Sequence, residues 1–239
     1  MAIEREHILP VSWAVLRLLT GITVEVAKPL PAAETQILAA VPHTSHLDTL
    51  TLLLALEHRA RELTIVVKGS YWKDRATYRL LLNLVAPGYV AIEEHKPKEN
   101  FHRLIGAIEA AQDQKRKILL GIFPQGTRQR DHELAFGYAF LSAHTHVPIT
   151  PVVIEHMPPA FMQGDLSLMK VARFAMSQQF GKDKKPPIRV SFLEPIYPPA
   201  NTPVKRAKQV VAKAYQERLR EHDWQETIPA FVLESQKTE

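Results

Sequence analysis

The chain has 239 residues, 46% hydrophobic and 23% charged, which is the composition of a globular protein and excludes wholesale disorder. It contains no cysteine, which excludes disulfides, thiolate metal ligands and a cysteine nucleophile. The net charge of +5 favours anionic partners such as lipid head groups, although a mildly basic surface explains it equally well. The length fits one α/β domain spanning residues 1–239.

The amino-terminal segment, residues 1–21, is predicted to contain an amphipathic or buried helix. The apolar stretch at 11–27 is interrupted by Arg17 and Glu25, so it is too short and too charged to span a bilayer. Charged residues at positions 4–6 precede it, which is the wrong order for a signal peptide. We therefore expect a cytoplasmic protein, with peripheral contact on the inner face of the membrane as the alternative.

Apolar runs and helical periodicity alternate along the rest of the chain. Short apolar or β-branched runs predict strands at 22–26, 37–41, 63–67, 89–92, 118–123, 147–154 and 188–193. Helices are predicted at 71–84, 99–114, 133–143, 166–180 and 204–220, and after the N-cap Ser45.

This alternation predicts a single α/β domain with a central, largely parallel sheet flanked by helices. Residues 36–155 form the predicted motif-bearing core, and residues 200–239 a helical carboxyl-terminal region. The strand at 147–154 contains two prolines, which places its beginning near the margin of the sheet.

The strand at 118–123 leads into a loop that carries an arginine. Pro124 ends the strand pairing and Gly126 lets the backbone turn, so Thr127 and Arg128 follow at the strand's carboxyl end. That edge is where open α/β sheets bind ligands, and a guanidinium there suits a phosphate or a carboxylate.

The same loop differs from a nucleotide-binding P-loop. Gly121 and Gly126 have the Walker A spacing, but Thr127-Arg128 stands where Lys followed by Ser or Thr is required. Pro124 has no amide hydrogen to offer a phosphate. Nucleotide binding is therefore not predicted.

His43 and Asp48 follow the predicted buried strand at 37–41 and share the sheet edge of Arg128. An imidazole can take a proton from a hydroxyl, while a carboxylate on its other nitrogen orients the ring. The alternative is structural, with His43 capping the helix and Asp48 offsetting its dipole. Ser45 is not predicted as a nucleophile, because the chain has no Gly-x-Ser-x-Gly elbow.

Taken together, these motifs resemble those of the glycerolipid and lysophospholipid acyltransferases, typified by lysophosphatidic acid acyltransferase. The family's His-x4-Asp motif matches His43 to Asp48, and its Phe-Pro-Glu-Gly-Thr-Arg motif matches residues 123–128 with one change. Its Val-Pro-Ile-Val-Pro-Val segment matches residues 147–152. Order and separation also match, and the resemblance covers residues 37–154.

The resemblance implies transfer of a fatty acyl group from acyl-CoA or acyl carrier protein to a hydroxyl of a lysophospholipid-like or other lipid acceptor. We expect no cofactor, with acyl-CoA or acyl carrier protein as the co-substrate. His43 would be the general base and Asp48 its orienting partner. The expected substrate-binding residues are Ser45, His46, Lys96, Gln125, Gly126, Thr127 and Arg128.

Two departures from the family pattern concern charge. Gln125 replaces the family's Glu and removes a negative charge. Glu94 falls where the family's second motif has an Arg that grips the acceptor phosphate. Either Lys96 or Lys98 substitutes, or the acceptor is altered, and we favour a neutral or amine-bearing lipid or a glycosylated terpenoid. Both departures motivate an alternative function, a non-catalytic lipid-binding or regulatory protein on the same scaffold.

Other polar groups have simpler explanations. His144 and His146 form an alternating pair without an evident third ligand, so no metal site is predicted. No nucleic-acid motif accompanies the basic residues of the last helix. These residues face solvent or anionic lipid: Lys205, Arg206, Lys208 and Lys213.

Overall fold

The computed structural model describes residues 21–32, 35–41, 43, 47–56, 59, 62–68, 88–93, 95–124, 137–155, 176–177 and 186–222, to which all structural statements refer. The strands are β1 (Val24–Lys28), β2 (Gln36–Val41), β3 (Leu63–Lys68), β4 (Gly88–Ile92), β5 (Leu119–Ile122), β6 (Ile149–Glu155) and β7 (Ile188–Phe192). The helices are α2 (Leu47–Leu56), α5 (Pro97–Asp113), α6 (Gly137–Thr145) and α9 (Val204–Glu221).

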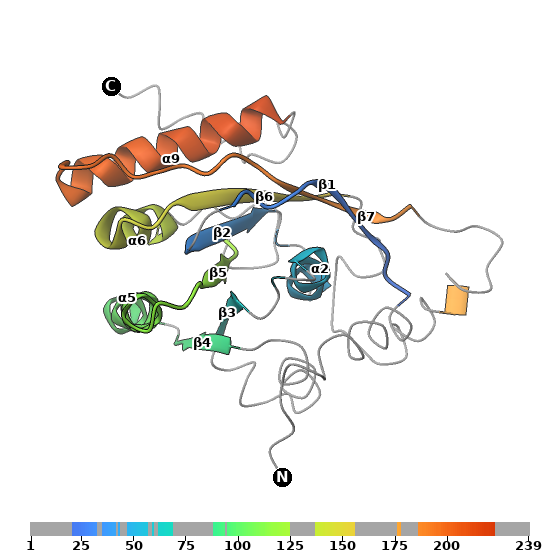
Figure 1. The fold of residues 1–239 in the computed structure, drawn as a ribbon, viewed down its shortest axis with the longest axis horizontal. Helices are drawn as coiled ribbons and strands as arrows, with labels where there is room; N and C mark the ends of the chain where they lie inside the picture. Colours follow the sequence, from blue (N-terminus) through green and yellow to red (C-terminus); the bar gives the residue numbers. More distant parts are fainter. Residues whose placement is uncertain are drawn as a thin grey trace, which may run out of the picture.

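The strands form one seven-stranded sheet in the order β1-β7-β6-β2-β5-β3-β4 (Figure 1). The five strands from β6 to β4 are parallel, whereas β7 is antiparallel to β6 and β1 is parallel to β7. The predicted α/β domain with a largely parallel, mixed sheet is therefore confirmed. Because β2 and β5 are parallel neighbours, with Ala39 opposite Ile122, the segments after these two strands begin side by side.

The central strand β2 is buried on both faces of the sheet, and its side chains alternate between them. In β2, Leu38 and Ala40 pack with α2, while Ile37, Ala39 and Val41 pack with α5, α6 and α9. All six residues of β2 are buried. The uninterrupted apolar strand is thus a consequence of helices covering both faces, as the sequence pattern predicted.

The carboxyl-terminal helix α9 is tied to the centre of the sheet by a buried tyrosine. The Tyr215 hydroxyl donates a hydrogen bond to the backbone oxygen of Ala39, at 3.1 Å. The ring of Tyr138 in α6 lies 4.8 Å from that of Tyr215, between centroids. Burial raises the pKa of both phenols. The apolar face of α9 therefore packs on the middle of β2, four residues before His43.

The prediction that the proline-containing strand begins near the margin of the sheet is wrong. Strand β6 lies in the interior, between β7 and β2. Pro148 precedes the strand, and the carbonyl of Pro151 accepts a hydrogen bond from the amide of Leu193, just after β7 ends. The amide and the carbonyl of one strand residue point to the same side, so the N–H that Pro151 lacks would have pointed towards β7. Because the ladder with β7 has already ended at this point, the sheet tolerates the proline.

One strand begins later than predicted, and several predicted helices cannot be compared with the structure. Strand β1 begins two residues later than predicted, because Ile22 and Thr23 precede the ladder that Val24 starts with Ile188. The predicted amino-terminal helix and the helix at 71–84 lie outside the described residues, as does most of the helix at 166–180. No helix in the described part of the chain is long and apolar enough to cross a membrane.

Candidate active site

His43 and Asp48 meet at the carboxyl end of β2. His43 lies two residues beyond the strand, and Asp48 is the second residue of α2. The Nδ1 atom of His43 lies 3.0 Å from Oδ2 of Asp48. Because a carboxylate oxygen only accepts, Nδ1 carries the proton in the neutral ring and Nε2 is the basic nitrogen. The arrangement is that of an imidazole base with its orienting carboxylate.

The two members of this pair differ in exposure. The Asp48 side chain is fully buried, whereas 19% of the His43 side chain is exposed. Asp48 also lies in the first turn of α2, where the helix dipole stabilises a negative charge. The carboxylate is therefore held inside the protein, and the imidazole stands between it and the surface.

Phe123, the first residue of a second sequence motif, lies at the same place. Its ring stacks on the imidazole of His43, with 4.3 Å between centroids and 22° between planes. It directly follows β5, and β5 and β2 run in register with Ile122 opposite Ala39. Phe123 and the His43–Asp48 pair thus come together, although Phe123 lies 75 positions after Asp48 in the sequence.

Most of the remaining predicted site residues lie outside the described residues. These are Ser45, His46, Gln125, Gly126, Thr127 and Arg128, together with Glu94. Their roles stay predictions. The structure describes Lys96, and it lies at the start of α5 rather than beside His43.

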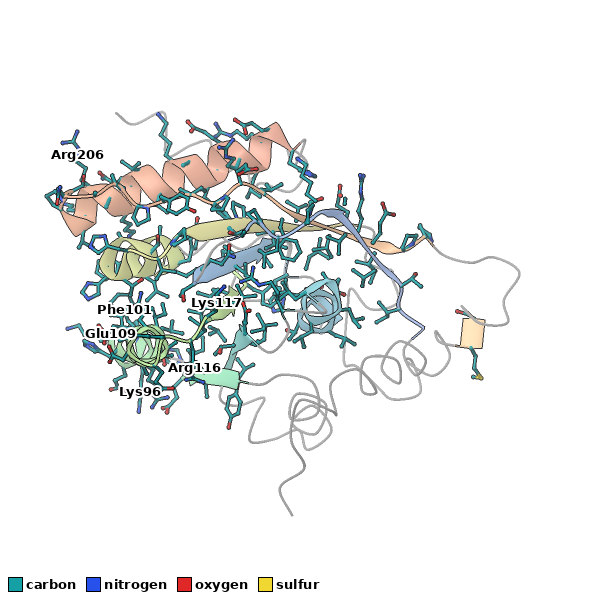
Figure 2. The ribbon with its side chains drawn as sticks, in the orientation of Figure 1. Lys96, Phe101, Glu109, Arg116, Lys117 and Arg206 are labelled. Carbon is teal, nitrogen blue, oxygen red and sulfur yellow. The ribbon has the colours of Figure 1, made fainter. Side chains whose placement is uncertain are left out.

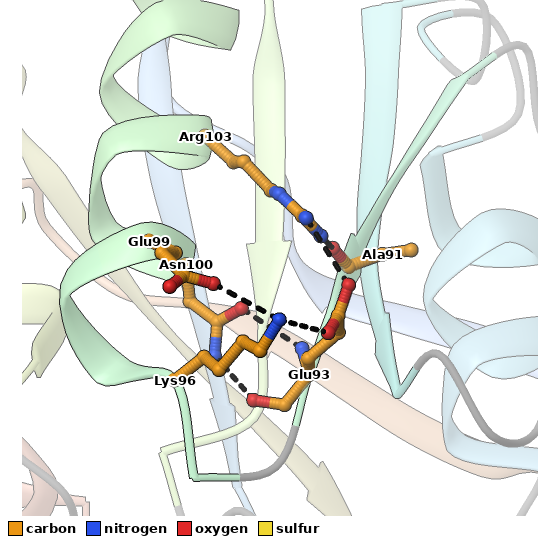
Figure 3. A network of polar contacts seen from close by, with 6 residues as sticks. All are labelled: Ala91, Glu93, Lys96, Glu99, Asn100 and Arg103. Atoms are coloured by element: carbon orange, nitrogen blue, oxygen red, sulfur yellow. Dashed lines mark hydrogen bonds and ion pairs between the residues drawn. The ribbon is translucent and has the colours of Figure 1, made fainter.

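Lys96 belongs to a network of charged side chains at the turn between β4 and α5 (Figure 3). Its Nζ atom lies 3.0 Å from Oε2 of Glu93 and 3.3 Å from Oε2 of Glu99. Arg103 donates to the other oxygen of Glu93, at 3.1 Å, and to the backbone oxygen of Ala91, at 3.2 Å. Hydrogen bonds from Lys96 and Arg103 lower the pKa of Glu93, and those to Glu93 and Glu99 raise the pKa of Lys96.

His144 takes part in an aromatic cluster between α5 and α6. Its ring lies 5.8 Å from that of Phe101, edge to face, and 6.3 Å from that of Phe140. Figure 2 shows Phe101 on the side of α5 that faces α6. Among the described residues there is no group of three histidine, cysteine or acidic residues that could hold a metal ion. The structure gives His144 a packing role on the surface of the helices.

Two features of the site were not foreseen from the sequence. The stacking of Phe123 on His43 could have been inferred, since two buried parallel strands that end at one edge bring their following residues together. The network around Glu93 could not, because it depends on how far α5 is turned about its axis, and on Asn100 and Arg103 lying above the end of β4.

Comparison with known proteins gives the family. Residues 21–155 match the family model described as Acyltransferase, a segment that includes His43, Asp48 and Phe123. A search of curated protein sequences found no match. Among solved structures, the fold is similar to the 1-acyl-sn-glycerophosphate acyltransferase PlsC from Thermotoga maritima, with a TM-score of 0.52 and 15% identity, over 91% of this chain and 84% of that chain.

The similarity to this solved structure supports the fold alone, because the two sequences are only 15% identical. The family model covers more than half of the 239 residues. The chain therefore belongs to the acyltransferase family and is an acyltransferase.

Proposed function

We propose that the protein transfers a fatty acyl group from a thioester donor, acyl-CoA or acyl carrier protein, to a hydroxyl of a lipid acceptor, with His43 as the general base. The observation that carries this proposal is the 3.0 Å contact between Nδ1 of His43 and the buried carboxylate of Asp48, within a chain of the acyltransferase family. The contact leaves Nε2 as the nitrogen that can accept a proton.

This geometry supports a direct transfer of the acyl group. Nε2 of His43 takes the proton of the acceptor hydroxyl as its oxygen attacks the thioester carbonyl, and a tetrahedral intermediate forms. Collapse of the intermediate breaks the carbon–sulfur bond and expels the thiolate, which takes the proton from the imidazolium. The products are the acyl ester and the free thiol. No covalent acyl-enzyme is needed.

Asp48 has two roles in this mechanism. Its Oδ2 accepts the Nδ1 hydrogen of His43 and so selects the tautomer that is basic at Nε2. Its negative charge stabilises the imidazolium that exists between the two proton transfers. Because the carboxylate is buried, water screens this attraction little.

The test compares acyl transfer by the purified wild type with that by a variant that lacks the His43 imidazole. His43→Ala should abolish the release of free CoA from palmitoyl-CoA in the presence of lysolipid and monoacylglycerol acceptors, while its circular dichroism and thermal unfolding match the wild type. Palmitoyl carried by acyl carrier protein is assayed in parallel, because both donors are thioesters.

A matched control removes another histidine. His102 is exposed on α5, so His102→Ala should keep the wild-type rate. Full activity of a folded His43→Ala protein would refute the assignment of the base. Tight lipid binding by the wild type, with no thiol released from either donor and any acceptor, would favour the alternative of a non-catalytic lipid-binding or regulatory protein.

A further inference from the structure

Thr51 lies in α2, one turn beyond the carboxylate that contacts His43. The residue is fully buried, and its hydroxyl oxygen Oγ1 has no hydrogen-bond partner among the described residues. A buried hydroxyl without a partner destabilises a fold, whereas a valine of the same shape does not. The hydroxyl of Thr51 therefore points to a role other than packing.

Two hydroxyls of α6 show the usual arrangement. Thr145 donates to the backbone oxygen of Leu141, four residues earlier, at 2.8 Å, which is the common bond of a threonine in a helix. The buried Ser142 donates to the backbone oxygen of Val147, at 2.6 Å. The hydroxyl of Thr51 makes neither kind of bond, so it is available to a different acceptor.

The helix places Thr51 next to Asp48. Residues three apart in an α-helix lie on the same side, with their Cβ atoms about 5–6 Å apart, and helical side chains lean towards the amino end. The side chain of Thr51 therefore leans towards the carboxylate of Asp48. Oδ2 of that carboxylate contacts Nδ1 of His43, and its other oxygen, Oδ1, is buried as well.

This side of α2 faces the sheet. A Cβ atom added at Gly121 of β5 would lie 3.4 Å from Cδ2 of Leu52. Leu52 follows Asp48 by four residues, so Asp48, Thr51 and Leu52 share the side of α2 that faces β5. The hydroxyl of Thr51 is thus enclosed between helix and sheet, where water screens the attraction between a donor and a carboxylate little.

We propose that Thr51 is a positioning residue of the acyl transfer, whose hydroxyl donates a hydrogen bond to the Asp48 carboxylate. Rotation about the Cα–Cβ bond turns the hydroxyl towards this acceptor, since threonine adopts two side-chain conformations in helices. A carboxylate held by both Thr51 and His43 keeps Oδ2 aimed at Nδ1 while the imidazole takes and returns the proton. The proposal rests on the proposed function, because it concerns the orientation of the same base.

The experiment compares two pairs of proteins that differ mainly in the hydroxyl. The wild type and Thr51→Val have side chains of the same shape, and Thr51→Ser and Thr51→Ala differ by one oxygen atom. In each pair, the protein without the hydroxyl should release CoA from palmitoyl-CoA, with a lysolipid acceptor, at a kcat about three- to thirtyfold lower and at an unchanged acceptor KM. Circular dichroism and thermal unfolding check the fold, and the Ser and Ala pair decides if Thr51→Val does not fold.

Two further measurements separate positioning from packing. Thr49→Val is the matched control: Thr49 is buried in the same helix, but it adjoins Asp48 in the sequence, and adjacent residues of a helix do not face each other. Its kcat should stay at the wild-type value. In an Asp48→Asn background, Thr51→Val should change kcat by less than about twofold, because the carboxylate that Thr51 positions is gone.

The outcomes keep the two proposals apart. Equal kcat values within both Thr51 pairs, an equal loss in Thr49→Val, or a loss that persists in full in the Asp48→Asn background would overturn the inference and leave the proposed function intact. Absence of thiol release by the wild type with every acceptor would instead remove the proposed function, and the inference with it.

Discussion

The ring of Phe123 lies flat against the imidazole of His43, 4.3 Å away between centroids and 22° from parallel. The two residues follow neighbouring strands, so the backbone of the sheet sets their spacing. One face of the imidazole is thereby covered by an aromatic ring, which restricts rotation of the proposed base. The electron-rich face of the phenyl ring would also attract the imidazolium that the proposed mechanism forms.

Phe123→Leu should lower kcat because it keeps an apolar side chain but removes the aromatic face. A cation–π contact of about 0.5–2 kcal/mol corresponds to a loss of about 2- to 30-fold. The acceptor KM should stay unchanged and Phe123→Tyr should restore kcat, which separates this role from general packing. Proton NMR gives an independent signature, since the ring protons of His43 should move downfield when the phenyl ring is lost. Unchanged kcat and unchanged His43 resonances in Phe123→Leu would contradict the positioning role.

Asp48→Asn should leave the protein folded but nearly inactive. The side chain keeps its size in a fully buried position, yet its amide can donate to Nδ1 and so favour the tautomer in which Nε2 carries the hydrogen. A comparable change in the serine protease triad costs about 10⁴-fold in kcat, so a loss on the order of 10³-fold or more is expected. Steady-state kinetics and thermal unfolding measure the two properties separately. A loss below tenfold would mean that Asp48 holds α2 in place and does not orient the base.

The sequence predicted the parts of this structure that depend on local pattern. The pair was placed at the sheet edge from local features, each of which acts within a few residues. These features are the apolar run of β2 and the spacing from His43 to Asp48. The partner of β1 could not be predicted, since Val24 pairs with Ile188 across more than 160 residues. The ion pairs of Lys96 with Glu93 and Glu99 could not be predicted either, because they depend on the turn that His95 makes with a positive φ.

Gly121→Ala should destabilise the sheet beneath the site. A Cβ atom at this position of β5 would lie 2.8 Å from Cδ1 of Ile65 and 3.4 Å from Cδ2 of Leu52, and the Ile65 side chain is fully buried. Overpacking of this kind typically costs about 1–3 kcal/mol in the free energy of unfolding. Urea unfolding measures the change.

Two further variants test the cause of that change. Ile65→Val deletes the clashing Cδ1 atom, so the Gly121→Ala/Ile65→Val protein should be more stable than the sum of the single changes predicts. Gly106→Ala, in α5 with no atom within 4 Å of the added carbon, should instead stabilise the protein by about 1 kcal/mol. Additive effects of the changes at positions 121 and 65 would rule out the contact as the cause.

Tyr138 and Tyr215 should make the protein sensitive to alkali. Burial raises the pKa of both phenols above their ordinary value of 10.0, so the folded protein keeps them neutral where the unfolded chain ionises them. The unfolded state then binds fewer protons, and stability falls as the pH rises above about 10, whereas below that pH their contribution is fully present.

Tyr138→Phe/Tyr215→Phe should weaken this dependence in urea unfolding between about pH 8 and 11, measured against the wild type. It should also lose about 1 kcal/mol at neutral pH, because the hydrogen bond to Ala39 is gone. Tyr197→Phe is the control: its side chain is 64% exposed, so the alkaline slope should stay at the wild-type value, and an equal change in both proteins would contradict the assignment to the buried pair.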